Sequence, residues 1–450
     1  MISSQSGGIL SFDEACLTVQ AHCREILNRP KQVEELPLLQ TPGRVLAEPL
    51  LADRDFPPFP RATRDGFAIR AADLGQNGTA LLRIVGQVKA GDSYDLPLVS
   101  GEAVEIMTGA AVPQGADAVV MVEYTERKTN PKGNEEAQRE KVPEHTASDD
   151  VLEGLAGPGK NSSVMTESDD MVEIKRTVST GENVVPAGAE AKAGQELLPR
   201  GTRMGPAQIA MAAAAGNASL QVFRKPRVAI LSTGDELVDV AEKPGPSQIR
   251  NSNSYSLAAL VAANGGEPVQ LPIASDEEGK LTELVRKGLK ADLLLLSGGV
   301  SMGKFDLVEK VLKALGAEFF FTGVMIQPGK PVVFGVVGET PFFGLPGNPI
   351  SVMVTFDLFA RQLVEALSGA EPARLRSATA RLKKEFKTKT GLTRFLPAIL
   401  ESELYDAQVE LVPWQGSGDL LAASRANCYL VVPPDREKLA KGEMVTVVVR

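Results

Sequence analysis

Residues 227–237 read RVAILSTGDEL, and residues 291–306 read ADLLLLSGGVSMGKFD. In both stretches an apolar run of strand length is followed directly by a loop of glycine, hydroxyl and acidic residues. Segments with helical spacing lie between and after such runs, at residues 253–263, 277–290, 305–315 and 350–367. Alternation of strands and helices at this spacing predicts a three-layer α/β domain over residues 226–370, with right-handed crossovers.

Three further units are expected around this α/β domain. Ser11 and Glu14 form a capping box at the start of a helix that runs to about residue 28. We assign residues 1–50 and 190–225 to a helical and linker unit. Short β-like runs between glycine and proline turns predict an inserted β-rich unit at residues 51–189. Residues 371–450 read as short strands and turns, which predicts a C-terminal β-barrel or sandwich.

One segment of the inserted unit differs in composition from the rest of the chain. Residues 126–173 hold twelve acidic and six basic residues, with a Gly-Pro-Gly sequence at 157–159. Because this composition shows little periodic apolar pattern, the segment is expected to be a solvated, mobile acidic insertion.

Composition excludes several classes of function. The 450 residues include 48 basic and 57 acidic side chains, a net charge of −9, which argues against nucleic-acid binding. Two histidines and three cysteines are too few for a zinc site of known spacing, a Ser-His nucleophile system or a disulfide framework. The N-terminus lacks the features of a signal peptide, and no apolar run approaches the ~20 residues of a membrane span. A cytoplasmic protein that does not act on membranes is therefore expected.

Four loops should meet at the carboxyl edge of the α/β sheet, where ligands of such sheets bind. They lie at residues 232–236, 274–276, 297–303 and 344–349, with Asp306 just beyond the third. Glycines let backbone N–H groups approach a phosphate, and several carboxylates beside it would favour a hard cation such as Mg²⁺. Helix caps and solvated loop acids are the alternative interpretation, and the residues alone leave both open. The absence of a GxxxxGK[ST] sequence excludes a P-loop.

A second set of residues carries positive charge or a hydroxyl group. Lys330 lies in the sequence QPGKP, Arg394 follows Leu392-Thr393, and Ser417 lies in QGSG. If the three side chains converge, they suit a small tetrahedral oxyanion. The alternative is that they are unrelated surface groups, because spacing alone does not bring them together.

Six motifs, in this order, carry a resemblance to a known family. They are DGFA at 65–68, IMTGA at 106–110, STGDEL at 232–237, SGGVSMGKFD at 297–306, PGKP at 328–331 and GLPGNPIS at 344–351. The motifs extend from residue 65 to residue 351, and nearly the whole chain resembles the molybdopterin molybdenumtransferase family, whose members include the E domain of gephyrin. The family's four-part architecture matches the units assigned above.

The resemblance implies the last step of molybdenum cofactor synthesis. In this Mg²⁺-dependent reaction adenylylated molybdopterin is hydrolysed, AMP leaves and molybdate is inserted into the dithiolene. The resemblance also implies an elongated homodimer whose cleft is shared between the α/β domain of one protomer and the N-terminal units of the other. Molybdopterin adenylyltransferase and apo-molybdoenzymes are the expected partners.

The resemblance carries over residue roles by motif position. Catalytic roles fall to Asp65, Thr108, Glu236, Asp276 and Asp306, the last three as candidate Mg²⁺ ligands. Molybdopterin binding falls to Thr233, Gly234, Asp235, Ser297, Gly298, Gly299, Ser301, Pro346, Gly347, Asn348 and Pro349. Molybdate binding falls to Lys330, Arg394 and Ser417.

This chain departs from the family pattern in three places. The family commonly has an arginine-rich run after a Gly-x-Asn turn, whereas residues 181–187 here read GENVVPA, and Glu190 stands where an aspartate is expected. Gly323 and Gln327 replace lysines that some members have before PGKP. Positive charge facing an anionic substrate is reduced, which gives an alternative function as a weakened paralogue that carries molybdopterin or acts as a scaffold. Retention of all five catalytic positions favours the enzyme, and the choice between molybdenum and tungsten stays open.

Overall fold

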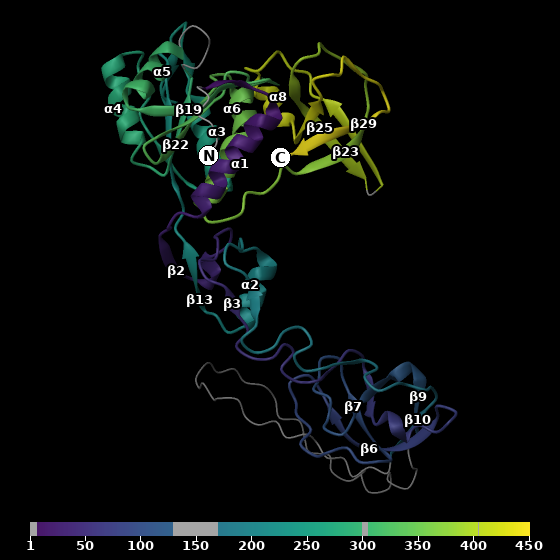
Figure 1. The fold of residues 1–450 in the computed structure, drawn as a ribbon. Helices are drawn as coiled ribbons and strands as arrows, with labels where there is room; N and C mark the ends of the chain where they lie inside the picture. The colour runs from purple at the N-terminus through teal and green to yellow at the C-terminus, as the bar shows by residue number, and fades with distance from the viewer. Residues whose placement is uncertain (1–6, 129–169, 299–304, 404) are drawn as a thin grey trace, which may run out of the picture. The chain divides into compact units, whose positions relative to one another are not determined.

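A computed structural model describes residues 7–128, 170–298, 305–403 and 405–450, with only the backbone described at 305 and 306. The chain forms two compact units (Figure 1). The larger unit joins Met1–Pro49 to Pro199–Arg450, and the smaller unit is Leu50–Leu198. None of the described helices is both long enough and apolar enough to cross a membrane.

A seven-stranded sheet forms the centre of the larger unit, in the order β1-β19-β21-β22-β18-β14-β17. Its strands are β1 (Gly8–Leu10), β14 (Arg227–Ser232), β17 (Glu267–Gln270), β18 (Leu293–Ser297), β19 (Ala317–Val324), β21 (Val333–Val337) and β22 (Thr340–Leu345). The four strands β17, β14, β18 and β22 are parallel, while β21 is antiparallel to both of its neighbours. The carboxyl ends of the four parallel strands therefore lie at one edge of the sheet.

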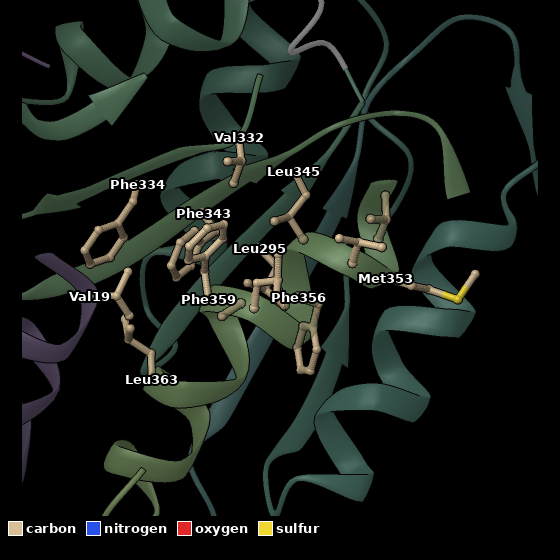
Figure 2. Packing of buried hydrophobic residues seen from close by; sticks show 14 of the residues in the cluster. Val19, Leu295, Val332, Phe334, Phe343, Leu345, Met353, Phe356, Phe359 and Leu363 are labelled. Atoms are coloured by element: carbon tan, nitrogen blue, oxygen red, sulfur yellow. The ribbon is translucent and has the colours of Figure 1, made fainter. Parts of the chain in front are cut away.

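Helices cover both faces of this sheet, which confirms the predicted three-layer domain. They are α3 (Ser252–Ala263), α4 (Glu278–Gly288), α5 (Phe305–Ala314), α6 (Pro349–Thr355) and α7 (Arg361–Leu367), with a π-helical turn at Phe356–Ala360 between the last two. Alternate residues of β14 enter two separate cores: Val228 and Ile230 pack with α3, α6 and α7, whereas Ala229 and Leu231 pack with α4 and α5. Figure 2 shows part of the first core, where Leu295 and Leu345 lie among aromatic rings.

The N-terminal helix packs differently from the sequence assignment. Helix α1 (Phe12–Leu27) begins at the predicted capping box, in which the Ser11 side chain accepts from the Glu14 N–H and the Glu14 carboxylate accepts from the Ser11 N–H. Its buried side chains, Val19 among them, belong to the same core as α6 and α7 (Figure 2). Helix α1 thus packs in the same core as the helices on this face of the α/β sheet.

Residues 29–49 and 199–225 form a small lobe of the larger unit. Strand β2 (Val33–Pro37) pairs with β13 (Ser219–Phe223), and helix α2 (Pro206–Ala214) lies beside a short 3₁₀ turn at Leu38–Gln40. A further short ladder of β15 (Leu237–Val238) and β16 (Ile249–Arg250) leads from the first loop of the α/β domain to α3.

The C-terminal residues form a closed five-stranded barrel, which resolves the choice between barrel and sandwich. The strands concerned are β20 (Ile326–Gln327), β23 (Ser377–Leu382), β25 (Thr393–Glu403), β26 (Asp406–Leu411), β27 (Cys428–Val432) and β29 (Met444–Val449). The barrel closes because β25 pairs with both β26 and β27, and β20 adds outside it onto β25. Helix α8 (Leu420–Arg425) and the β24–β28 pair (Phe386–Lys387 with Lys438–Leu439) complete the region.

The smaller unit contains a six-stranded sheet in the order β8-β5-β7-β6-β10-β9. Its strands are β5 (Gly66–Ile69), β6 (Ala80–Val88), β7 (Glu102–Ile106), β8 (Ala118–Met121), β9 (Thr125–Lys128) and β10 (Met171–Ile174). Two short pairs, β3 (Leu50–Leu51) with β12 (Glu196–Leu198) and β4 (Arg61–Ala62) with β11 (Val184–Val185), flank the sheet.

The predicted acidic insertion is too long at both ends. Residues 126–128 belong to β9 and residues 171–173 to β10, and the two strands pair with Lys128 opposite Met171. Lys128 and Glu173 form an ion pair across this ladder. From composition alone, both charged residues were assigned to the solvated segment. The remainder of the prediction, residues 129–169, lies outside the described residues.

Gly66 is expected to be essential for the smaller unit. A Cβ atom added at Gly66 would lie 1.8 Å from the Val120 carbonyl oxygen, at a φ of +159°. Gly66→Ala should lower the free energy of unfolding by about 3 kcal/mol, because the backbone of β8 must move. Hydrogen exchange of the β5–β8 amides measures the loss. Gly91→Ala is the control, since Gly91 also has a positive φ (+95°) but nothing within 4 Å of the added atom. Equal losses of unfolding free energy in the two variants would contradict the predicted clash with the Val120 carbonyl oxygen.

Residues 129–169 are expected to be dispensable for folding. Because Lys128 and Met171 are paired, a short Gly/Ser turn can join the two strands without changing their register. The shortened protein should keep the melting temperature of the parent within a few degrees, since the segment has too little apolar surface to offset its ordering entropy. Failure of the shortened chain to fold, measured by circular dichroism, would show that the segment is structural.

Candidate functional site

The loops after β14, β17 and β18 are joined at the carboxyl edge of the α/β sheet. The Thr233 N–H donates to the Ser297 carbonyl at 3.0 Å, and the Gly234 N–H donates to the Ala274 carbonyl at 3.2 Å. Asp235 accepts a bond from the Asp276 N–H at 3.1 Å. The structure therefore brings together the predicted residues Thr233, Gly234, Asp235 and Ser297 with the loop that carries Asp276.

Close approach of two glycines holds the loop after β18 against its neighbours. Gly298 has a φ of +88°, and a Cβ atom there would lie 2.5 Å from the Thr233 carbonyl oxygen. A Cβ added at Gly347 would lie 3.6 Å from the Gly298 Cα atom. The loop of Pro346–Pro349 thus lies beside Gly298. Gly299 and Ser301, predicted for the same site, lie outside the described residues.

Asn253, which the sequence analysis did not assign, joins two of these loops. It lies in the first turn of α3, and its Nδ2 donates to the Ser297 hydroxyl at 3.0 Å and to the Gly347 carbonyl at 2.7 Å. Because a carbonyl only accepts, the amide nitrogen must face Gly347, which leaves Oδ1 on the opposite side. The sequence signal was present in Asn251-Ser252-Asn253 at the start of a helix, where polar residues usually serve as caps.

Buried polar atoms without partners gather at the same edge. Among the described residues, four buried side-chain polar atoms have no hydrogen-bond partner, and three of them belong to Thr233, Asn253 and Ser275. Thr233 is only 2% exposed, so its hydroxyl group has been removed from water. Since leaving such groups unpaired costs about 1–3 kcal/mol each, their number here fits a site completed by a polar ligand.

Carboxylates surround this edge without forming a preformed metal cluster. Asp235, Glu236 and Asp276 are exposed, and the Glu236 carboxylate folds back over Gly234. Within the described residues no group of three Asp, Glu, His or Cys side chains is close enough to hold a metal ion. The side chain of Asp306 lies outside the described residues. The donor chemistry still fits Mg²⁺, which usually binds one or two carboxylates together with substrate phosphates.

A cavity of about 490 Å³ lies on the other side of the Pro346–Pro349 loop. Its walls include Gln327, Lys330, Asn348, Trp414 and Ser417, from strand β20, the PGKP turn, the loop before α6 and the loop before α8. Two of the three residues predicted to meet molybdate, Lys330 and Ser417, therefore line one cavity. The Ser417 hydroxyl accepts a bond from Asn348 Nδ2 at 2.9 Å, and the Ser417 carbonyl accepts from the Ile350 N–H at 3.0 Å.

The third predicted molybdate residue, Arg394, is not part of the cavity wall. Arg394 is 6% exposed and lies opposite Gln327 in the β20–β25 ladder. Its Nε donates to Gln327 Oε1 at 2.9 Å and its Nη1 to the Leu392 carbonyl at 3.1 Å. No acidic side chain of the described residues forms an ion pair with Arg394, and burial lowers the pKa of its guanidinium group. A guanidinium buried without an acidic partner among the described residues is energetically costly.

Asp65 and Thr108 form a pair within the smaller unit. Asp65 Oδ1 accepts bonds from the Thr108 N–H at 2.6 Å and from the Thr108 hydroxyl at 2.7 Å. The two residues meet because β5 and β7 pair with Gly66 opposite Ile106. These two bonds hold the pKa of the Asp65 carboxyl below its usual value, so it is a carboxylate at neutral pH and acts only as an acceptor.

Arg61, which lies beside the segment where arginines were expected, has an acidic partner. Val184 and Val185 form β11, which pairs with Arg61 and Ala62 of β4. Arg61 Nη2 lies 3.4 Å from Glu190 Oε1, and both side chains are largely exposed. Glu190 therefore offsets the positive charge that Arg61 supplies at this ladder.

The Asp65 pair gives a prediction about acidity. Thr108→Val removes one of the two hydrogen bonds to Asp65 and should raise the pKa of this carboxyl towards its ordinary value. The backbone N–H remains, so the pKa should not return fully. Carbon-13 NMR titration of the Asp65 carboxyl measures the shift. Thr125→Val is the control, because the Thr125 hydroxyl donates to the Val122 carbonyl and not to Asp65. An unchanged pKa in Thr108→Val would show that the Thr108 hydroxyl does not donate to Asp65.

Three family models together match nearly all of the chain. Residues 10–216 match the MoeA N-terminal region (domains I and II), residues 229–366 match the probable molybdopterin binding domain, and residues 379–449 match the MoeA C-terminal region (domain IV).

Known proteins resemble the chain over at least 90% of its length. The molybdopterin molybdenumtransferase of Bacillus subtilis is 31% identical over 408 residues, which cover 90% of this chain and 86% of that protein. The molybdopterin molybdenumtransferase of a Nostoc species is 32% identical over 437 residues, covering 94% and 89%. A crystal structure of the molybdopterin biosynthesis moeA protein from Pyrococcus horikoshii OT3 aligns with a TM-score of 0.72 at 27% identity, covering 98% of this chain and 100% of that one. The chain belongs to the molybdopterin molybdenumtransferase family.

Proposed function

We propose that this protein inserts molybdate into adenylylated molybdopterin, with Mg²⁺-dependent hydrolysis and release of AMP. One observation carries the proposal: the Pro346–Pro349 loop is a wall shared by two sites. Through the Gly347 carbonyl it binds Asn253 at the glycine-lined edge of the sheet, and through Asn348 it binds Ser417 in the cavity. A pterin substrate held at the first site would present its sulfur atoms near an oxyanion held at the second.

The charges around the cavity support an oxyanion substrate. Lys330 adds a cation to the wall, and the unpaired guanidinium of Arg394 lies directly behind Gln327. Because Arg394 is buried, water screens its charge less than that of an exposed side chain. Both charges favour a doubly negative anion such as molybdate.

The unpartnered polar atoms at the sheet edge support a heterocyclic substrate. Asn253 Oδ1 is an acceptor, so it suits the N–H groups of a pterin and not a phosphate oxygen. Gly298 packs against the Thr233 carbonyl oxygen and so holds two loops of this edge together. The edge therefore offers an acceptor to the heterocyclic part of the proposed substrate.

Mg²⁺ would be held by carboxylates at this edge, with Glu236, Asp276 and Asp306 as the proposed ligands. When bound, Mg²⁺ would neutralise negative charge on the pyrophosphate. The chain's own part is to orient the substrate: Asp235 holds the Asp276 loop in place through its bond to the Asp276 N–H. In the proposal Asp65 stays ionised and accepts a hydrogen bond during hydrolysis, because its lowered pKa keeps it a carboxylate.

The proposal includes a cytoplasmic homodimer that receives its substrate from molybdopterin adenylyltransferase and passes its product to apo-molybdoenzymes. The three cysteines of the chain are free thiols, which suits a reducing compartment. Size measurement by light scattering tests the dimer.

Incubation with adenylylated molybdopterin, Mg²⁺ and molybdate tests the activity. AMP should appear, and the product should activate an apo-molybdoenzyme. A protein that binds the pterin tightly but releases no AMP would instead be a carrier or scaffold. Replacement of molybdate by tungstate in the same assay identifies the preferred metal.

Removal of a proposed Mg²⁺ ligand should reduce activity without unfolding the protein. Asp276→Asn and Asp306→Asn should each lower AMP release at limiting Mg²⁺ by at least tenfold, because a hard cation loses an oxygen ligand. The melting temperature should change little. Glu283→Gln is the control, since it removes one exposed carboxylate from the middle of α4. Wild-type turnover in both Asn variants would refute the assignment, and a lower melting temperature with full activity would indicate capping.

A further inference from the structure

The cavity beside the Pro346–Pro349 loop presents hydrogen-bond donors, and none of its described lining residues is acidic. Its described lining residues include Gln327, Lys330, Asn348 and Ser417 but no Asp or Glu. We propose that this cavity selects tetrahedral oxyanions that carry no proton, and that Gln327 is the residue that determines this selectivity. The inference rests on the proposed function, in which the same cavity binds molybdate.

The orientation of the Gln327 amide follows from its contact with Arg394. A guanidinium group has donors only, so the bond from Arg394 Nε must end on the amide oxygen of Gln327. The amide nitrogen therefore lies on the other side, on a side chain that is exposed and lines the cavity. Arg394 is itself fixed by a second bond, to the Leu392 carbonyl. Arg394 thus acts as a positioning residue, which turns Gln327 into a donor for a bound anion.

Ser417 is held as a donor in a comparable way. Its hydroxyl oxygen accepts the bond from Asn348 Nδ2, so its hydrogen is left to donate. Lys330 adds an ammonium group, which has three donors and no acceptor. Three side chains from separate segments thus offer donors to one cavity.

The acidic residue nearest to Ser417 in sequence is Asp419, and its carboxylate binds backbone N–H groups. Asp419 lies two residues after Ser417, but its carboxylate oxygens accept bonds from the Gln415 and Ala422 N–H groups as the N-cap of α8. These bonds keep the pKa of Asp419 below its usual value. Asp419 therefore offers no carboxylate in the cavity for a protonated ligand.

A site in which Gln327, Lys330 and Ser417 offer donors and no carboxylate is present among the described lining residues discriminates between anions of equal charge. Molybdate, tungstate and sulfate have no proton near neutral pH, and all of their oxygens accept. Hydrogen phosphate carries one P–O–H group, which needs an acceptor and would face a donor here. Where the P–O–H group meets a donor side chain of the cavity, one hydrogen bond is lost and the two hydrogens repel each other. Hydrogen phosphate should therefore bind more weakly than sulfate or molybdate.

Anion titrations at pH 8 and constant ionic strength test this selectivity. Sulfate and hydrogen phosphate are then dianions of similar size that differ in one proton. Trp414 is the only tryptophan of the chain and lines the cavity, so its fluorescence reports binding, and equilibrium dialysis with molybdate is the second readout. Sulfate and tungstate should displace molybdate at concentrations at least tenfold lower than phosphate.

Gln327→Glu tests the residue assigned to selectivity. This isosteric change replaces the amide donor by an acceptor and pairs Arg394 with a carboxylate. Molybdate binding should weaken at least tenfold and phosphate binding much less, so that the preference between them narrows. Gln415→Glu is the matched control, because it adds the same charge two residues from Ser417 on an exposed side chain. The control should weaken both anions by a similar small factor.

The outcomes separate this inference from the proposed function. Equal affinity of the wild-type protein for sulfate and phosphate would refute the selectivity, while molybdate binding and AMP release would still support the proposed function. If Gln327→Glu weakens molybdate and phosphate binding by the same factor, Gln327 affects anion binding in general and does not determine the selectivity. If neither readout detects molybdate at the wild-type cavity, the inference and the proposed oxyanion site both fail.

Discussion

The four leucines at 293–296 of β18 have no exposed surface, and they pack into two different cores on opposite faces of the sheet. A strand buried on both faces has no room for polar side chains along its length. Full burial of each leucine contributes about 2 kcal/mol, so a polar replacement within the strand would be costly. Polar atoms can appear only where the strand ends, at Ser297 and Gly298. The same constraint acts on β14, which places the chemistry of the α/β domain at one edge.

The local sequence pattern was sufficient to predict these helices and strands and the edge of the sheet where the polar loops lie. The capping box at Ser11, the strand at 227–232 and the run of leucines are all specified by neighbours in sequence, and each is present as predicted. The partner of helix α1 was not predictable, because an apolar stripe shows that a helix is buried but not against what. The insertion boundaries were wrong for a related reason: charges paired across the β9–β10 ladder look the same in sequence as charges in water.

The candidate site was predicted in part, along similar lines. Glycine and acidic loops at strand ends follow from sequence order and sheet topology, so the grouping of Thr233, Ser297 and the Asp276 loop could be expected. Asn253 was not assigned, since an asparagine at a helix start has an ordinary capping role, and Asn348 was assigned by motif position without its contact to Ser417. Their function depends on a distant carbonyl and a distant hydroxyl, at Gly347 and Ser417, which no spacing rule relates to them.

At Gln327 the structure changes the interpretation of a departure from the family pattern. From sequence, a glutamine in place of a lysine is the loss of a positive charge facing an anion. In the structure the glutamine oxygen binds Arg394, a buried cation whose field is weakly screened. The positive charge of Arg394 therefore acts on the cavity from behind Gln327. The neutral amide of Gln327 also donates a directed hydrogen bond. A lysine at this position would add charge but would place two cations together, and it has no oxygen with which to satisfy Arg394 Nε. The glutamine is therefore compatible with anion binding because of the arginine behind it, and the two residues are best understood as one unit.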